Sequence, residues 1–199
     1  YRDCPALPWD ADDAAAVLLA WGAGPGWPGL ARARAVLLAA LDVDGSVRTW
    51  VADPDHPERR LVGPWLGPVC NGVAARALRA MAGDPAFEPA VVQRTARWLA
   101  ARAEPDGGFL GEHYPSRVLV TALVLEALAA VETDDGTAGG AVERAAAWLA
   151  REQRPDGAIG RSALETGAAL LALCRVGPLD GELATAAAGF LVRSQRWDG

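Results

Sequence analysis

The chain has 199 residues, a formal net charge of −6 and 51% hydrophobic residues. That length allows one sizeable core, while the acidic balance and the absence of lysine argue against nucleic acid as a partner. No run approaches the roughly 18 uninterrupted apolar residues of a membrane span, and no secretory signal opens the chain, so we expect a cytoplasmic protein without a membrane span.

In chain order, four strongly apolar segments alternate with more polar ones. They cover residues 13–21, 71–81, 121–131 and 166–176, and each begins at or near a small polar residue suited to an N-cap. A helix that is apolar all round is buried on both sides, whereas a helix with Arg and Glu on one face lies outside it. The alternation predicts stacked helical hairpins, each with an inner and an outer helix.

The outer segments repeat a short pattern in which an Asp-Gly turn follows an aromatic position of the helix. The interval is eight residues in three copies: Trp98 to Asp106-Gly107, Trp148 to Asp156-Gly157, and Phe190 to Asp198-Gly199. A weaker first copy ends at Asp44-Gly45. Because Gly commonly ends a helix or forms a turn, each copy indicates a helix followed by a stop. We therefore expect about eight helices, with residues 47–51 as a short extended piece. Trp98 and Trp148, which lie on outer helices at the repeat spacing, are expected to have structural roles.

Two patterns carry a family resemblance. Residues 153–157 and 195–199 read Gln-x-x-Asp-Gly, and Asp10-Ala11-Asp12-Asp13 reads Asp-x-Asp-Asp at the start of an inner segment. Together they resemble class II, protonation-initiated terpene cyclases, which are related to squalene–hopene-type cyclases.

The resemblance covers essentially the whole chain and implies a single all-α domain over residues 1–199. The expected fold is an α/α barrel of stacked hairpins with about 8 of the family's 12 helices, an incomplete (α/α)6 barrel truncated at both ends. A missing segment, a partner chain or a homo-oligomer is then expected to complete the barrel.

The acidic cluster suits alkene protonation. An alkene is a feeble base, so its acid must be a neutral carboxylic acid in a dry pocket, and crowded carboxyls retain a proton because they cannot all ionise cheaply. The resemblance implies that Asp12 delivers the proton, that Asp10 and Asp13 tune and orient it, and that Asn71 hydrogen-bonds the second oxygen of the acid. The plain alternative is that the acidic residues and Asn71 cap their helices.

The resemblance also implies a substrate and its surroundings. The expected reaction is protonation of the terminal alkene or epoxide of geranylgeranyl or farnesyl diphosphate, followed by cyclisation to a bicyclic, labdane- or drimane-type diphosphate. Aromatic faces stabilise carbocations, and the expected lining consists of Trp50, Trp65, His113 and Tyr114. Protonation needs no cofactor and no metal ligands stand out, although Mg²⁺ could assist at the diphosphate, where Arg59, Arg60 and Arg117 are candidate contacts.

Two other classes stay open. A squalene cyclase or a protein prenyltransferase β subunit shares the helical repeat, but the latter needs a zinc site, and Cys70 and His113 lack its partners and spacing. A non-catalytic α/α barrel that serves as a binding or assembly module would leave the acidic cluster vestigial.

Overall fold

The computed structural model describes residues 8–21, 27–51, 69–177 and 180–195. These residues form eight helices and two short strands. The helices are α1 (Ala11–Trp21), α2 (Pro28–Ala40), α4 (Asn71–Ala82), α5 (Pro89–Ala100), α6 (Arg117–Leu128), α7 (Thr137–Arg151), α8 (Ala163–Val176) and α9 (Gly181–Ser194), and the strands are β1 (Trp9–Asp10) and β2 (Trp50–Val51). None of the described helices is long and apolar enough to cross a bilayer.

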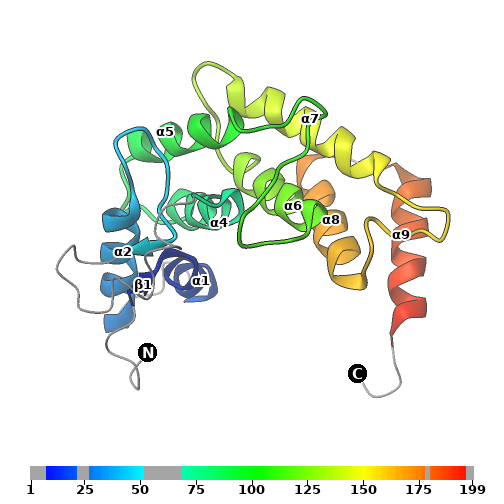
Figure 1. The fold of residues 1–199 in the computed structure, drawn as a ribbon, viewed down its shortest axis with the longest axis horizontal. Helices are drawn as coiled ribbons and strands as arrows, with labels where there is room; N and C mark the ends of the chain where they lie inside the picture. The colour runs from blue at the N-terminus through cyan, green and yellow to red at the C-terminus, as the bar shows by residue number, and fades with distance from the viewer. Residues whose placement is uncertain (1–7, 22–26, 52–68, 178–179, 196–199) are drawn as a thin grey trace.

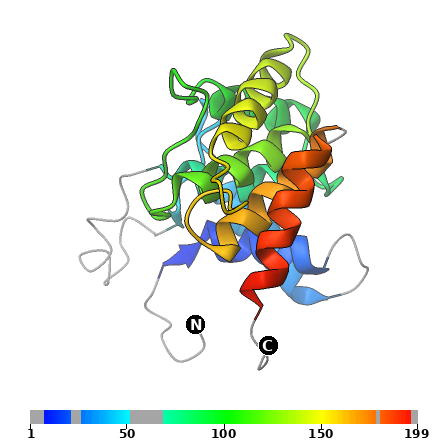
Figure 2. The same cartoon turned by 90° about the vertical axis from the view of Figure 1, so that its right-hand side faces the viewer.

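The helices are arranged as four hairpins in an open arch. The inner helices α1, α4, α6 and α8 pack on one another in that order, and each is paired with the outer helix that follows it in the chain. Figure 1 shows the outer helices along the convex side and the inner helices on the concave side, and Figure 2 shows the arch edge-on. This arrangement confirms the predicted all-α, α/α-barrel architecture.

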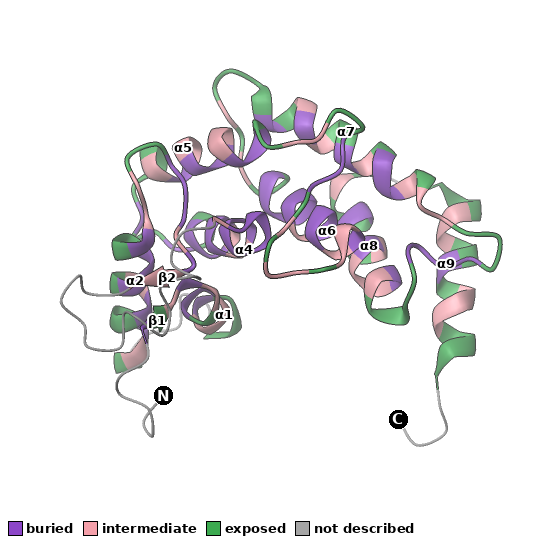
Figure 3. Cartoon of the chain, in the orientation of Figure 1, coloured by how far each residue is buried: buried purple, intermediate pink, exposed green. Residues whose placement is uncertain are grey.

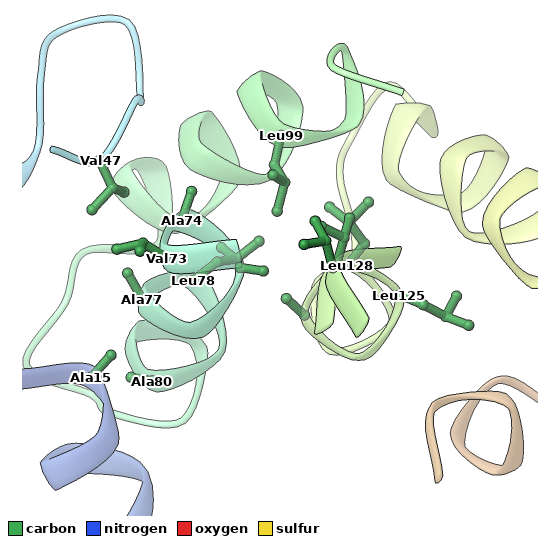
Figure 4. Packing of buried hydrophobic residues seen from close by; sticks show 14 of the residues in the cluster. Ala15, Val47, Val73, Ala74, Ala77, Leu78, Ala80, Leu99, Leu125 and Leu128 are labelled. Atoms are coloured by element: carbon green, nitrogen blue, oxygen red, sulfur yellow. The ribbon is translucent and has the colours of Figure 1, made fainter. Parts of the chain in front are cut away.

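Burial follows the predicted contrast between inner and outer helices. Along α4, nine of the residues are buried, whereas the outer helices expose the face that points away from the arch (Figure 3). Small side chains such as Ala15 and Ala80 lie where α1 meets α4, while Leu99 reaches in from α5 (Figure 4). The alanines allow the inner helices to approach closely, which explains why the inner segments are so rich in this residue.

The N-terminal ends of two inner helices differ from the prediction. Helix α6 begins at Arg117 and helix α8 at Ala163, each a few residues earlier than expected, because serines cap them. The Ser116 hydroxyl accepts a hydrogen bond from the Leu119 amide at 3.0 Å, and Ser162 caps α8 in the same way. Of the two predicted placements of Thr121 and Thr166, at the N-cap or near it, the first is therefore excluded.

Thr121 and Thr166 instead tie the repeat turns to the inner helices. Each threonine hydroxyl accepts a hydrogen bond from the backbone amide two residues after an Asp-Gly turn. The donors are Phe109, at 2.9 Å from Thr121, and Ile159, at 3.0 Å from Thr166. Because both threonines are fully buried, these contacts satisfy backbone groups that water cannot reach.

The Asp-Gly turns dock on the next outer helix in three successive repeats. Their glycines have positive φ angles and leave no room for a Cβ atom, which would lie 2.3–2.7 Å from a backbone oxygen of that helix. The pairs are Gly45 with Arg94 of α5, Gly107 with Arg144 of α7, and Gly157 with Ala186 of α9. The repeated motif is therefore a structural joint between consecutive hairpins.

At the C-terminal ends of the inner helices, a buried carboxylate links three of them. Glu126 of α6 has only 7% of its side chain exposed and pairs with Arg79 of α4 and, at 3.3 Å, with Arg175 of α8. Removing either partner of such a buried pair is costly because a charge is left uncompensated.

Candidate active site

The acidic cluster lies where the chain enters α1. Strand β1 pairs antiparallel with β2, which places Asp10 opposite Trp50, and the Ala11 amide donates to the Thr49 carbonyl at 2.8 Å. The Asp10 carboxylate then accepts a hydrogen bond from the Asp12 amide at 2.7 Å. Asp10 thus acts as the N-cap of α1, as the plain reading expected, and fixes the direction in which the helix starts.

Asp12 points into the molecule. Its side chain is 21% exposed and lies between α1, α4 and the loop that precedes α6. The Tyr114 hydroxyl donates to Oδ2 at 2.5 Å. The Arg76 guanidinium approaches both carboxylate oxygens, with Nε 3.2 Å from Oδ1 and Nη1 3.4 Å from Oδ2. One carboxyl group is therefore held by two donors that come from distant parts of the chain.

The environment favours the neutral forms of Asp10 and Tyr114. Burial raises the pKa of Asp10, and the negative charges of Asp13 and Asp12 add to the rise, while hydrogen bonds from backbone amides act against it. Burial, followed by the hydrogen bond to Asp12, raises the pKa of Tyr114 to about 12, so the phenol keeps its proton and can donate. Asp13 is exposed, and its charge acts on the cluster from the surface.

Tyr114 is seated against a glycine of α4. A Cβ atom at Gly72 would lie 2.5 Å from the Tyr114 ring, so only glycine allows the ring to reach Asp12. We expect Gly72→Ala to push the phenol away from Asp12 and to lower turnover about tenfold, the effect of losing one hydrogen bond to a charged group.

Tyr114→Phe is the matched control for this prediction, because it removes the same hydrogen bond without moving the ring. Steady-state kinetics of Gly72→Ala, Tyr114→Phe and the double variant should give the same loss in all three. A double variant that loses the product of the two single effects would contradict the proposed contact.

The predicted contact between Asn71 and Asp12 is not among the hydrogen bonds that the structure describes. Asn71 is buried, its amide nitrogen donates to the Leu110 carbonyl at 2.8 Å, and its oxygen accepts from Arg102 Nε at 2.7 Å. Nor does Asn71 cap α4, because the N-cap is Cys70 and no side chain caps that end. Asn71 holds the loop that carries Tyr114 against α4, and Tyr114 and Arg76 provide the donors on Asp12.

Only some of the residues predicted to form an aromatic lining are placed near the acidic cluster by the structure. Trp50 lies beside Asp10 in the short sheet and is half-buried, and Tyr114 contacts Asp12. His113 is half-buried next to Tyr114 in the same loop. Trp65, like Arg59 and Arg60, lies outside the described residues.

Arg117 interacts with the repeat turn at Asp106 and with Trp148. Its guanidinium pairs with Asp106 and lies 4.8 Å from the centre of the Trp148 ring. The Trp148 indole also donates to Asp106, at 3.2 Å, and the ring is buried. The hydrogen bond from Arg117 lowers the pKa of Asp106 to about 2. This cluster belongs to the repeat turn, which agrees with a structural role for Trp148 and argues against Arg117 as a diphosphate contact.

Two inner helices expose large apolar side chains. On α1 they are Leu19, two turns beyond Asp12, and Trp21, whose ring stacks on that of Trp27. On α8 they are Leu164 and Leu171. The helix that carries the acid therefore also presents apolar surface that a hydrocarbon can contact.

Arg76 was not predicted as a site residue, although a signal was present. It is a charged residue in the middle of a segment expected to be apolar all round, and such a residue must find a partner when its helix is buried. Across the described part of the chain, no three His, Cys, Asp or Glu residues are grouped so that they could hold a metal ion.

Comparison with known proteins identifies the family of the chain. Residues 39–199 match the family model described as "Squalene-hopene cyclase C-terminal domain". No curated protein sequence matches the chain.

Among solved structures, the chain is similar to a protein from Actinoplanes, with 27% identity over 97% of this chain and 59% of that one, and a TM-score of 0.73. It shares its fold with the type II terpene cyclase MstE from Scytonema (24% identity, 97% and 57% covered, TM-score 0.71). It also shares its fold with ent-copalyl diphosphate synthase from Streptomyces platensis (24% identity, 95% and 36% covered, TM-score 0.70). The chain therefore spans less than two thirds of the length of each of these proteins.

Proposed function

The chain belongs to the squalene–hopene cyclase C-terminal domain family, and from this premise we propose that it carries the catalytic acid of a class II terpene cyclase. The proposed substrate is a linear prenyl diphosphate, and the proposed product is a bicyclic diphosphate of the labdane or drimane type. The observation that supports this proposal best is the Asp12 carboxyl, which points inward and is held by Tyr114 and Arg76.

In the proposed first step, Asp12 protonates the terminal alkene or epoxide of the substrate. For the alkene, the O–H bond of Asp12 breaks, the π electrons form a new C–H bond at the CH carbon of the terminal (CH3)2C=CH group, and a tertiary carbocation remains on the dimethyl carbon. The carboxylate left on Asp12 keeps the Tyr114 and Arg76 contacts. The internal alkenes then close two rings and a proton is lost from the final cation, so the reaction is an isomerisation in which the C–O bond to the diphosphate stays intact.

The protein's role in this scheme is to orient the chain and to exclude water. The exposed apolar side chains of the inner helices, including Leu19 and Leu171, would hold the hydrocarbon by the hydrophobic effect. The π faces of Trp50 and Tyr114, both near the acid, and of His113 are proposed to stabilise positive charge as the rings form. Asn71 is proposed to support the acid indirectly, through the loop that it anchors.

Two relatives support a C20 chain as the first substrate to test. A variant of MstE was solved with geranylgeranyl dihydroxybenzoate as its substrate, and the Streptomyces platensis protein is named for ent-copalyl diphosphate. We therefore propose geranylgeranyl diphosphate first and farnesyl diphosphate second.

The proposed protonation requires no metal ion, because the proton comes from Asp12. Among the described residues, no three His, Cys, Asp or Glu side chains are grouped so that they could hold one. Any help that Mg²⁺ gives to diphosphate binding should appear as a change in KM between assays with Mg²⁺ and assays with EDTA.

The test is to incubate the complete protein with each diphosphate, remove the phosphates and analyse the alcohols by gas chromatography and mass spectrometry. A bicyclic alcohol from one of the two substrates is the expected result. If both are recovered unchanged with and without Mg²⁺, the proposal of a prenyl diphosphate cyclase is wrong.

One observation favours the binding-module alternative. An Arg–Asp pair such as Arg76–Asp12 is typical of an ionised carboxylate with a structural role. A binding module would retain a prenyl diphosphate in equilibrium dialysis and return it unchanged, which distinguishes it from the cyclase.

A further inference from the structure

We propose that Arg76 is the positioning residue that orients Asp12 and strengthens it as an acid, a role that rests on the proposed function. The group that must be stabilised during protonation is the carboxylate that Asp12 becomes. A guanidinium beside it provides that stabilisation before the reaction begins, which is the arrangement that makes electrostatic catalysis effective.

The contacts of Arg76 support this role. Its guanidinium lies 3.2 Å from one Asp12 oxygen and 3.4 Å from the other, and Nη1 also donates to the Tyr114 hydroxyl at 3.3 Å. Arg76 is thus in contact with both the acid and the second donor on that acid. The three side chains form a closed triangle that restricts the rotation of the Asp12 carboxyl.

Helix α4 carries a second arginine, Arg79, which has a different partner from Arg76. Arg79 lies one turn further along, and its guanidinium turns to Glu126 of α6. Both side chains are 31% exposed, so burial alone does not explain their different partners. Arg79 is therefore a matched control: it has the same charge on the same helix, without contact to Asp12.

The charged and titratable groups around Asp12 define what a pH profile would measure. Asp10 and Asp13 flank it in sequence, Arg76 faces it from α4, and Tyr114, with His113 beside it, faces it from the loop before α6. The outer helix α2 also packs on α1. Its Arg34 pairs with Asp84 at 2.7 Å, and its Arg32 lies 4.9 Å from the centre of the Trp9 ring. Among the described residues, Arg76 is the cation that pairs with Asp12 itself.

A cation in this place has two opposite effects. It makes the proton easier to transfer, because the product carboxylate is stabilised. It also makes the proton harder to retain, so the decline of activity with rising pH begins at a lower pH. A residue that merely supports the fold would produce neither effect.

The experiment is the pH dependence of kcat for the complete protein and its Arg76→Gln variant. We expect the plateau of kcat to fall about tenfold, because the acid becomes weaker. We also expect the basic limb of the profile, where kcat declines with rising pH, to shift to higher pH by about one unit or more. The reason is that the loss of a nearby positive charge favours the protonated form.

Arg76→Lys should return the basic limb toward its original position, since the charge is restored, but should recover only part of the plateau because an ammonium group cannot contact both oxygens as the planar guanidinium does. Arg79→Gln should lower the melting temperature without moving the limb. An Arg76→Gln variant with an unmoved limb would overturn the proposal, whether its plateau falls or not.

The outcome also separates this proposal from the proposed function. An active parent whose Arg76→Gln variant has an unmoved limb disproves only the role of Arg76. A parent that leaves both geranylgeranyl and farnesyl diphosphate unchanged disproves the cyclase and, with it, the role of Arg76.

Discussion

Asp12→Asn is expected to abolish cyclisation while leaving the fold intact. The amide is nearly the same size as the carboxyl and can keep a hydrogen bond with Tyr114, but it has no acidic proton to give to an alkene. A positioned general acid contributes about 10²–10⁴-fold to a rate, and a reaction that cannot start without protonation should show at least that loss. The measurement is kcat with geranylgeranyl diphosphate, accompanied by a thermal melt.

Asp13→Asn is the control for the first prediction. Asp13 is adjacent in sequence but exposed, so its replacement changes the charge of the cluster without removing the proton that is proposed to be transferred. Turnover by Asp13→Asn should fall much less than turnover by Asp12→Asn. If Asp12→Asn cyclises as well as the parent, or if Asp13→Asn alone is inactive, the proton donor has been assigned to the wrong residue.

Gly107→Ala is expected to cause the largest loss of stability of the glycine substitutions considered. Gly107 has a φ angle of +95°, and a Cβ atom would lie 2.7 Å from the Arg144 carbonyl oxygen of α7. The strained backbone alone costs about 1–3 kcal/mol, and α7 must also move away from the turn. For a protein of this size we expect the melting temperature to fall by about 6 °C or more.

Gly136→Ala separates the two causes of that loss. Gly136 also has a positive φ angle, +69°, but nothing lies within 4 Å of its Cβ position. Gly136→Ala should therefore show the backbone strain without the steric clash, and a smaller fall in melting temperature than Gly107→Ala. Equal falls in calorimetry would contradict the view that the Asp-Gly turns are joints between hairpins.

The hairpin arrangement was predictable because it depends on local patterns. Apolar inner segments and the eight-residue interval from Trp98 to Asp106 are read directly from the sequence, and each reflects one helix and its stop. The ends of the inner helices were less predictable, because Ser116 and Thr121 are both good capping residues. Only the packing of the preceding turn shows that Thr121 is needed to hold Phe109.

The candidate site was predictable only at its centre. The cluster Asp10 to Asp13 is contiguous, so its pattern is visible in the chain. Its partners are not: Tyr114 lies 102 residues from Asp12 and Arg76 lies 64 residues away. Asn71 was expected to bond the acid, but the contact depends on which way a side chain turns at the start of α4, and the loop carbonyl of Leu110 takes its amide instead.

The central claim, that this chain starts a cyclisation by protonating an alkene, is tested most directly by running the reaction in D₂O. The Asp12 proton exchanges with solvent, so the bicyclic diphosphate should carry one deuterium, on the carbon that was the CH of the terminal alkene. A cyclic product without deuterium, or one that has lost its diphosphate, would show that some other event starts the reaction.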